Sequence, residues 1–151
     1  MSTKIITLAI LSPLLLFAGC SNKDNSISEN YNRTIFVAKQ ELRVEVVDTD
    51  NAREIGLSGR THLNNENGML FDFTNTNISK PSFWMKDMKF DIDIIWIYNN
   101  SIVEIEPYVP ATYGSINLPT YSPSTDITHV LEVPAGWVDK YKIKVGDRIT
   151  M

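Results

Sequence analysis

Most of the chain from residue 35 onward consists of short runs in which β-branched or aromatic residues alternate with polar ones. The clearest run is residues 41–47, where Leu42, Val44 and Val46 share one face of an extended strand. Further runs follow at residues 69–73, 82–86, 92–98, 101–106, 127–133 and 145–151. No strand–helix–strand alternation typical of a parallel sheet accompanies them. The pattern predicts a mainly β (β-rich α+β) fold, a small mostly antiparallel barrel-like domain with one or two short helices.

Two segments carry helix signals. In the first, Asp48 or Thr49 offers an N-cap and Gly56 a C-cap, which predicts a short helix over residues 50–55. The second opens at Pro134 and runs through residue 140. Both helices are too brief to form a layer of their own, so the strands dominate the predicted fold.

A hairpin in the middle of the chain brings carboxylates together. Residues 92–98 and 101–106 are joined by Asn99 and Asn100, and asparagine tolerates the positive φ of a two-residue turn. That turn places Asp93 opposite Glu106, and Glu104 two residues away from Glu106. Carboxylates this close repel one another unless they are separated, protonated or met by a cation.

Two interpretations of this acidic cluster remain open. Asp93, Glu104 and Glu106 could bind a divalent metal of unknown identity or a basic ligand, or supply one carboxyl group for acid–base chemistry. Alternatively the cluster is structural, with Arg60, Lys86 or backbone amides satisfying Asp93 while the glutamates face water. No residue is assigned as catalytic.

A long loop is predicted over residues 107–125, which contain four prolines and little periodicity. Loops of this length without regular structure are uncommon in compact domains and are often functional. Tyr108, Tyr113 and Tyr121 make it a candidate recognition loop, because aromatic side chains supply rigid contact area. The alternative is that these rings only pin the loop to the barrel.

The N-terminus resembles a lipoprotein signal. Lys4 is followed by an apolar run over residues 5–17 and by small residues before Cys20, the only cysteine. The run is too short for a membrane-spanning helix, which needs about 20 apolar residues. We therefore expect a signal peptide over residues 1–19 and a lipid on Cys20. Residues 20–33 are then a polar, flexible tether and residues 34–151 a single domain.

We predict that the protein is located in the cell envelope and that the lipid on Cys20 anchors it to the membrane. Ser21 stands where an aspartate would retain many Gram-negative lipoproteins in the inner membrane. We therefore expect the outer membrane, facing the periplasm, if the source is Gram-negative. The chain has a net charge of −4, which argues against nucleic acid as a partner.

Several consecutive blocks of the domain carry a family resemblance. They are residues 49–60, 68–73, 83–86, 92–96, 130–136 and 146–148, in that order. Together they resemble the DUF192 family, also called UPF0127, across essentially the whole domain after the tether. The resemblance implies a mostly β, barrel-like domain and no agreed catalytic residues.

The sequence also lacks common signatures of hydrolases, nucleotide-dependent enzymes and metalloproteases. The prediction is therefore an envelope lipoprotein without a cofactor, acting as a non-catalytic module that binds an envelope protein or a small molecule. The alternative is an envelope enzyme or metal-binding protein that uses Asp93, Glu104 and Glu106.

Overall fold

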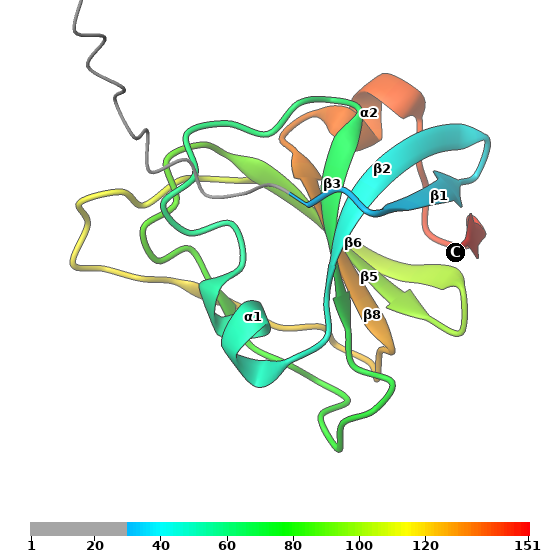
Figure 1. The fold of residues 1–151 in the computed structure, drawn as a ribbon, viewed down its shortest axis with the longest axis horizontal. Coiled ribbons are helices and arrows are strands. Elements are labelled where there is room, and N and C mark those ends of the chain that lie inside the picture. Colours follow the sequence, from blue (N-terminus) through cyan, green and yellow to red (C-terminus); the bar gives the residue numbers. More distant parts are fainter. Residues whose placement is uncertain (1–29) are drawn as a thin grey trace, which may run out of the picture.

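The structure of the protein is a computed structural model that describes residues 30–151. The predicted signal peptide, Cys20 and most of the predicted tether therefore lie outside the described residues. The described part is mainly β with two short helices, as predicted (Figure 1). Its elements are β1 (Arg33–Val37), β2 (Gln40–Val47), α1 (Asp50–Ile55), β3 (Asn67–Asp72), β4 (Phe83–Trp84), β5 (Ile92–Tyr98), β6 (Ser101–Val109), β7 (Thr120–Tyr121), β8 (His129–Pro134), α2 (Trp137–Tyr141) and β9 (Ile149–Thr150).

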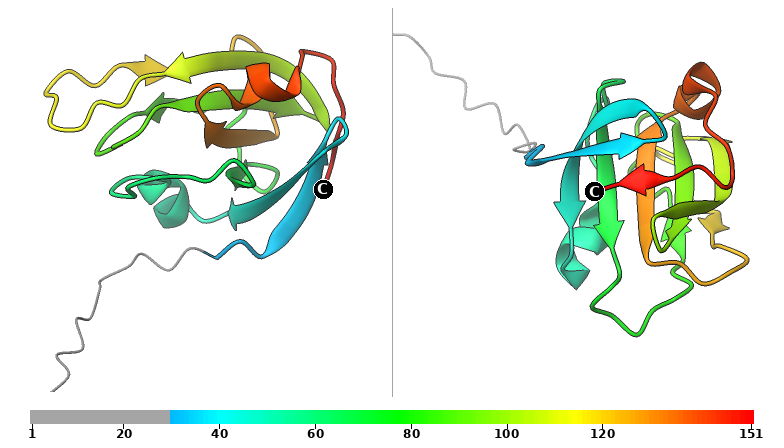
Figure 2. Two further views of the ribbon diagram at one scale, coloured as in Figure 1. Left: turned by 90° about the horizontal axis from the view of Figure 1, so that it is seen from above. Right: turned by 90° about the vertical axis from the view of Figure 1, so that its right-hand side faces the viewer.

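Seven of these strands form one curled sheet in the order β6-β5-β8-β3-β2-β1-β9 (Figure 2). Its neighbouring strands are antiparallel except for β2 and β3, which are parallel and connected through α1. At one end the outermost strands meet, because Ser101 in β6 forms a bridge with Arg148 just before β9. The remaining strands, β4 and β7, pair separately. The curled sheet is thus a half-barrel, in agreement with the predicted fold class.

The sheet has a hydrophobic core on each of its faces. The barrel core lies inside the curl and contains residues from all seven strands and from α2, among them Ile95 and Trp137. The outer core lies on the opposite face of β3, β5 and β8, and contains Phe71, Ile94 and Trp96. Each such fully buried side chain contributes roughly 1.5–3 kcal/mol relative to an exposed one. Strand β5 is buried on both faces, which explains its nearly continuous apolar sequence.

Both predicted helices are present, but the second begins later than the sequence predicts. Helix α1 spans the predicted residues, and Thr49 Oγ1 accepts a hydrogen bond from the backbone N–H of Ala52 at 3.2 Å. Helix α2 begins at Trp137 rather than at the predicted Pro134. The reason is that Pro134 still belongs to β8, and Gly136 has the left-handed φ of 81° that turns the chain into the helix. No helix within residues 30–151 has the length and apolar character needed to cross a membrane.

The central hairpin confirms the predicted turn and corrects the predicted register. Asn99 and Asn100 both have positive φ, 47° and 65°, as a two-residue turn requires. A β-bulge then shifts the pairing, so that Trp96 lies opposite Glu104, whereas a regular hairpin with this turn would place it opposite Val103. A bulge adds one residue to one strand, and every pair beyond it moves accordingly.

A second irregularity lies at Asp93. Glu106 pairs with Ile94, and the next pair joins Ile92 to Val109, so the predicted pairing of Asp93 with Glu106 is wrong. Strand β6 has an extra residue here and continues three residues beyond its predicted end. Tyr108, within this irregular segment, has a left-handed φ of 55°.

The side chain of Asp93 is fully buried and held by backbone N–H groups. Its Oδ1 accepts hydrogen bonds from Tyr108 N at 2.9 Å and Gly136 N at 3.1 Å, and its Oδ2 accepts one from Val138 N at 2.9 Å. One carboxylate therefore ties β5 to the irregular part of β6 and to the start of α2. Of the predicted structural partners, the backbone amides are the ones that bind it.

We predict that Asp93→Asn lowers the free energy of unfolding by about 2–4 kcal/mol, because an amide NH2 would face N–H donors that now have a carboxylate acceptor. Urea unfolding followed by tryptophan fluorescence measures this. Glu106→Gln is the matched control, since Glu106 is only half-buried. Equal midpoints for the two variants would contradict a structural role for Asp93.

Candidate functional site

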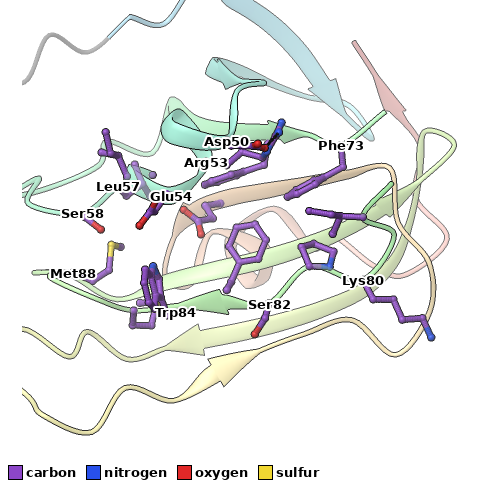
Figure 3. A pocket seen from close by; sticks show the side chains of 18 residues that line it. Asp50, Arg53, Glu54, Leu57, Ser58, Phe73, Lys80, Ser82, Trp84 and Met88 are labelled. Atoms are coloured by element: carbon purple, nitrogen blue, oxygen red, sulfur yellow. Dashed lines mark hydrogen bonds and ion pairs between the residues drawn. The ribbon is translucent and has the colours of Figure 1, made fainter. Parts of the chain in front are cut away.

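A cavity of about 500 Å³ opens on the outer-core side of the sheet, between α1 and the segment that contains β4 (Figure 3). We call it the Glu132 cavity, after the residue of β8 that lines it. Its other lining residues are mostly apolar. Among them are Leu57, Phe71, Phe73, Phe83, Trp84, Met85 and Met88.

Aromatic contacts hold the walls of the cavity in place. The ring of Phe83 in β4 meets Phe71 at 4.9 Å between centroids and Trp96 at 5.5 Å, both edge to face. A third edge contact joins Phe83 to Phe73 at 6.2 Å. Such pairs contribute about 0.5–1.5 kcal/mol beyond their buried area. Although β4 is only two residues long, it is therefore packed firmly against the large sheet.

Charged residues lie at the rim. The guanidinium of Arg53 in α1 donates hydrogen bonds to Asp50 Oδ1 at 2.6 Å and to the backbone oxygen of Asp72 at 2.7 Å. It also lies 5.1 Å from the centre of the Phe73 ring, beside which Figure 3 places it. On the other side, Lys80 Nζ donates to the backbone oxygen of Ser124 at 2.9 Å and points away from the cavity. Both of these cationic side chains thus already make hydrogen bonds to other groups of the protein.

Glu132 is the buried acid of the cavity. Only 6% of its surface is exposed, and within the described residues its carboxyl group makes no hydrogen bond or ion pair. Burial raises the pKa of this carboxyl group to about 8, although the positive charge of Arg60 acts in the opposite direction. Glu132 is consequently mostly protonated at neutral pH, and its O–H is available as a hydrogen-bond donor.

Arg60 is also buried, but it binds a different carboxylate. Its Nη2 donates to Glu45 Oε2 at 2.7 Å, while Nε and Nη1 have no hydrogen-bond partner among the described residues. The proposed ion pair of Arg60 with Asp93 is therefore not formed. Glu132 forms no ion pair with Arg60 or with another described residue, and its burial favours the neutral form.

The predicted acidic cluster does not form a metal-binding group. Glu104 Oε2 accepts hydrogen bonds from the backbone N–H and the hydroxyl group of Ser124, at 2.8 and 2.7 Å. Asp93 is enclosed by backbone amides, and Glu106 lies half-buried opposite Ile94. Within residues 30–151, no group of three His, Cys, Asp or Glu side chains is placed to hold a metal ion. Lys86, the other proposed partner of Asp93, instead lies over the Trp84 ring at 5.4 Å.

The three tyrosines of the predicted recognition loop have separate environments. Tyr108 lies in β6, and its hydroxyl group donates to Asp139 Oδ2 at 2.7 Å. Tyr113 is exposed, with the ammonium of Lys89 at 5.2 Å from its ring. Tyr121 lies in β7 and packs against the outer core. None of the three lines the Glu132 cavity.

Sequence reasoning did not select Glu132, although a signal was present. The residue interrupts an otherwise apolar run, Val130-Leu131-Glu132-Val133, in a strand that is buried on both faces. An acid within such a strand must face a partner, a cavity or a ligand. The alternation of β8 alone does not say which, because the cavity is built by α1 and β4 from other parts of the chain.

The raised pKa of Glu132 makes stability depend on pH. Its ordinary value is 4.5, so the folded state holds this proton more tightly than the unfolded state does. The stabilisation is complete below about pH 4.5 and is lost as the pH rises through about 8, a total of about 5 kcal/mol. We therefore expect the stability of the wild type relative to Glu132→Gln, which cannot titrate, to fall across this range and level off above it. Urea unfolding at a series of pH values measures the difference, and a flat difference would contradict the assignment.

Two solved structures are similar to the described domain. A protein of unknown function from Novosphingobium aromaticivorans DSM 12444 matches with a TM-score of 0.68 and 23% identity, over 78% of this chain and 84% of that one. A candidate transcription regulator from Sinorhizobium meliloti 1021 matches with a TM-score of 0.65 and 28% identity, over 78% and 89% respectively. The first, at this identity, shows the fold alone.

No protein of curated function matches the chain. The family model of DUF192, described as "Uncharacterized ACR, COG1430", matches residues 33–151, which span all of the strands and helices described above. The chain therefore belongs to the DUF192 family.

Proposed function

We propose that this protein is a lipid-anchored component of the bacterial cell envelope whose domain binds a small, predominantly apolar molecule in the Glu132 cavity. The observation that carries the proposal is the cavity itself, an apolar hollow with one buried, unpartnered carboxyl group. Ligand sites in proteins typically have volumes of about 300–1,000 Å³ and a few placed polar groups among apolar walls. A volume of about 500 Å³ suits a small molecule.

Binding without chemical transformation is the favoured role. Ser58 and Ser82 line the cavity, but neither histidine does, so no imidazole base stands beside a hydroxyl nucleophile. One observation supports an enzyme as the second candidate, since an acid whose pKa is raised by burial in a cleft is suited to donate a proton. An enzymatic role would therefore use Glu132 rather than the cluster of Asp93, Glu104 and Glu106.

The anchor is proposed from the N-terminal sequence. A lipid on Cys20 would leave thirteen residues before β1 begins at Arg33. Such a segment extends to at most about 45 Å, which keeps the domain close to the bilayer. We propose the outer membrane facing the periplasm for a Gram-negative source. The excess of acidic over basic residues supports a partner other than nucleic acid.

Filling the cavity should abolish binding. Ile55 lines the cavity and is 52% exposed, so Ile55→Trp adds bulk there without disturbing a core. With N-phenyl-1-naphthylamine, a neutral fluorescent apolar probe, we expect saturable binding to the wild type and at least about tenfold weaker binding to this variant. Ile116→Trp is the matched control, because Ile116 is fully exposed and does not line the cavity. Equal probe affinity in both variants would count against the cavity as the binding site.

The anchor has its own test. Cells grown with radiolabelled palmitate should incorporate label into the wild-type protein, whereas Cys20→Ser should remain unlabelled, because the thiol that carries the lipid is missing. Ser21→Ala is the control and should be labelled. An unlabelled wild-type protein would contradict the lipoprotein assignment.

A further inference from the structure

We infer that the Glu132 cavity is selective for neutral aromatic carbonyl compounds, whose oxygen atom accepts a hydrogen bond from the carboxyl group of Glu132. This inference rests on the proposed function and names the class of its ligand. Three observations support this ligand class: the polar group of the cavity that has no partner, the charges around that group, and the aromatic residues of the walls.

Glu132 is the one buried polar side chain of the cavity without a partner in the described part of the chain. The other polar groups are engaged or lie outside. Arg53 binds Asp50 and the backbone of Asp72, and Ser58 Oγ donates to the backbone oxygen of Lys86 at 2.8 Å. The remaining lining groups, at Glu54 and Ser82, are exposed to solvent. A ligand that enters the cavity therefore meets Glu132 as the buried polar group that no other described residue satisfies.

The charges around Glu132 favour a neutral ligand. Within residues 30–151, the charged group that acts on its pKa is Arg60, whose guanidinium is paired with Glu45. At the rim, Arg53 is paired with Asp50, Lys80 Nζ donates to the backbone oxygen of Ser124 and points away from the cavity, and Glu54 is exposed to solvent. An ammonium ligand would favour the ionised form of Glu132, which its burial opposes, and a carboxylate ligand would be desolvated beside a neutral carboxyl group. A carbonyl oxygen accepts the proton of the acid and carries no charge.

The walls favour a flat aromatic ring. Phe71, Phe73, Phe83 and Trp84 line the cavity, together with the thioethers of Met85 and Met88. The existing contacts between these phenyl rings are edge to face, at 4.9 and 6.2 Å. An additional ring can make the same kinds of contact, and sulfur atoms pack favourably against ring edges. Trp84 also lines the cavity and is 44% exposed, and the ammonium of Lys86 lies 5.4 Å from its ring.

The inference can be tested with three probes of matched shape, namely 4-phenyl-2-butanone, 4-phenylbutan-2-amine and butylbenzene. Binding to the domain is measured by ligand-observed NMR titration at about pH 6 and about pH 9. We expect the ketone to bind more tightly than the other two at the lower pH. Its affinity should fall about tenfold at the higher pH, because only about a tenth of Glu132, with its pKa of about 8, then retains its proton.

Two variants assign the effect to Glu132. Glu132→Gln retains an N–H donor but cannot ionise, so ketone binding should persist and lose its pH dependence. Glu132→Leu removes the donor, so the ketone should lose its advantage over butylbenzene while butylbenzene still binds. Unfolding curves of both variants verify that they fold.

The outcomes separate the inference from the proposed function. If butylbenzene binds the wild type, and Ile55→Trp blocks it, but the ketone has no advantage or the amine is preferred, the selectivity is wrong and the cavity remains a binding site. If none of the probes binds, or if Ile55→Trp and Ile116→Trp bind them equally, the proposed function fails together with the inference.

Discussion

The three hydrogen bonds to the carboxylate of Asp93 are the interaction on which the architecture depends. They join β5 to the irregular part of β6 and to the first residues of α2. Helix α2 carries Trp137 and Val138 into the barrel core, and it has only five residues. So short a helix is not stable by itself. Its position on the barrel core thus rests on packing and on this buried acceptor, which satisfies two N–H groups at its start.

The described domain contains two buried acids that illustrate opposite uses of a carboxyl group. Asp93 accepts hydrogen bonds from three backbone amides and holds elements together. Glu132 makes no hydrogen bond in the described residues, lies in an apolar cavity, and has a pKa raised to about 8. A fully satisfied buried group is explained by structure, whereas an unsatisfied one calls for a further explanation. The cavity supplies it, because a ligand can provide the missing partner.

Local sequence signals predicted local structure well. The Thr49 cap, the bounds of α1 and the turn at Asn99 and Asn100 follow from side-chain hydrogen bonding and backbone preferences within a few residues. The pairing beyond the turn was predicted wrongly, because a bulge depends on how both strands fit the rest of the sheet. One shifted residue moved Glu106 away from Asp93. The acidic cluster inferred from the ideal register was consequently not the group that the fold assembles.

The sequence by itself therefore determined the class of fold, the positions of most strands, the first helix and the family, since these depend on periodicity and on ordered local motifs. The tertiary structure decided the site. Glu132 comes from β8, while the cavity around it is closed by α1 and by the segment around β4, which lie more than forty residues earlier in the chain. Whether a buried acid is paired, enclosed by amides or left facing a cavity depends on these distant neighbours. The energy of an ionisable group is set by its surroundings in space, and those surroundings exist only after folding.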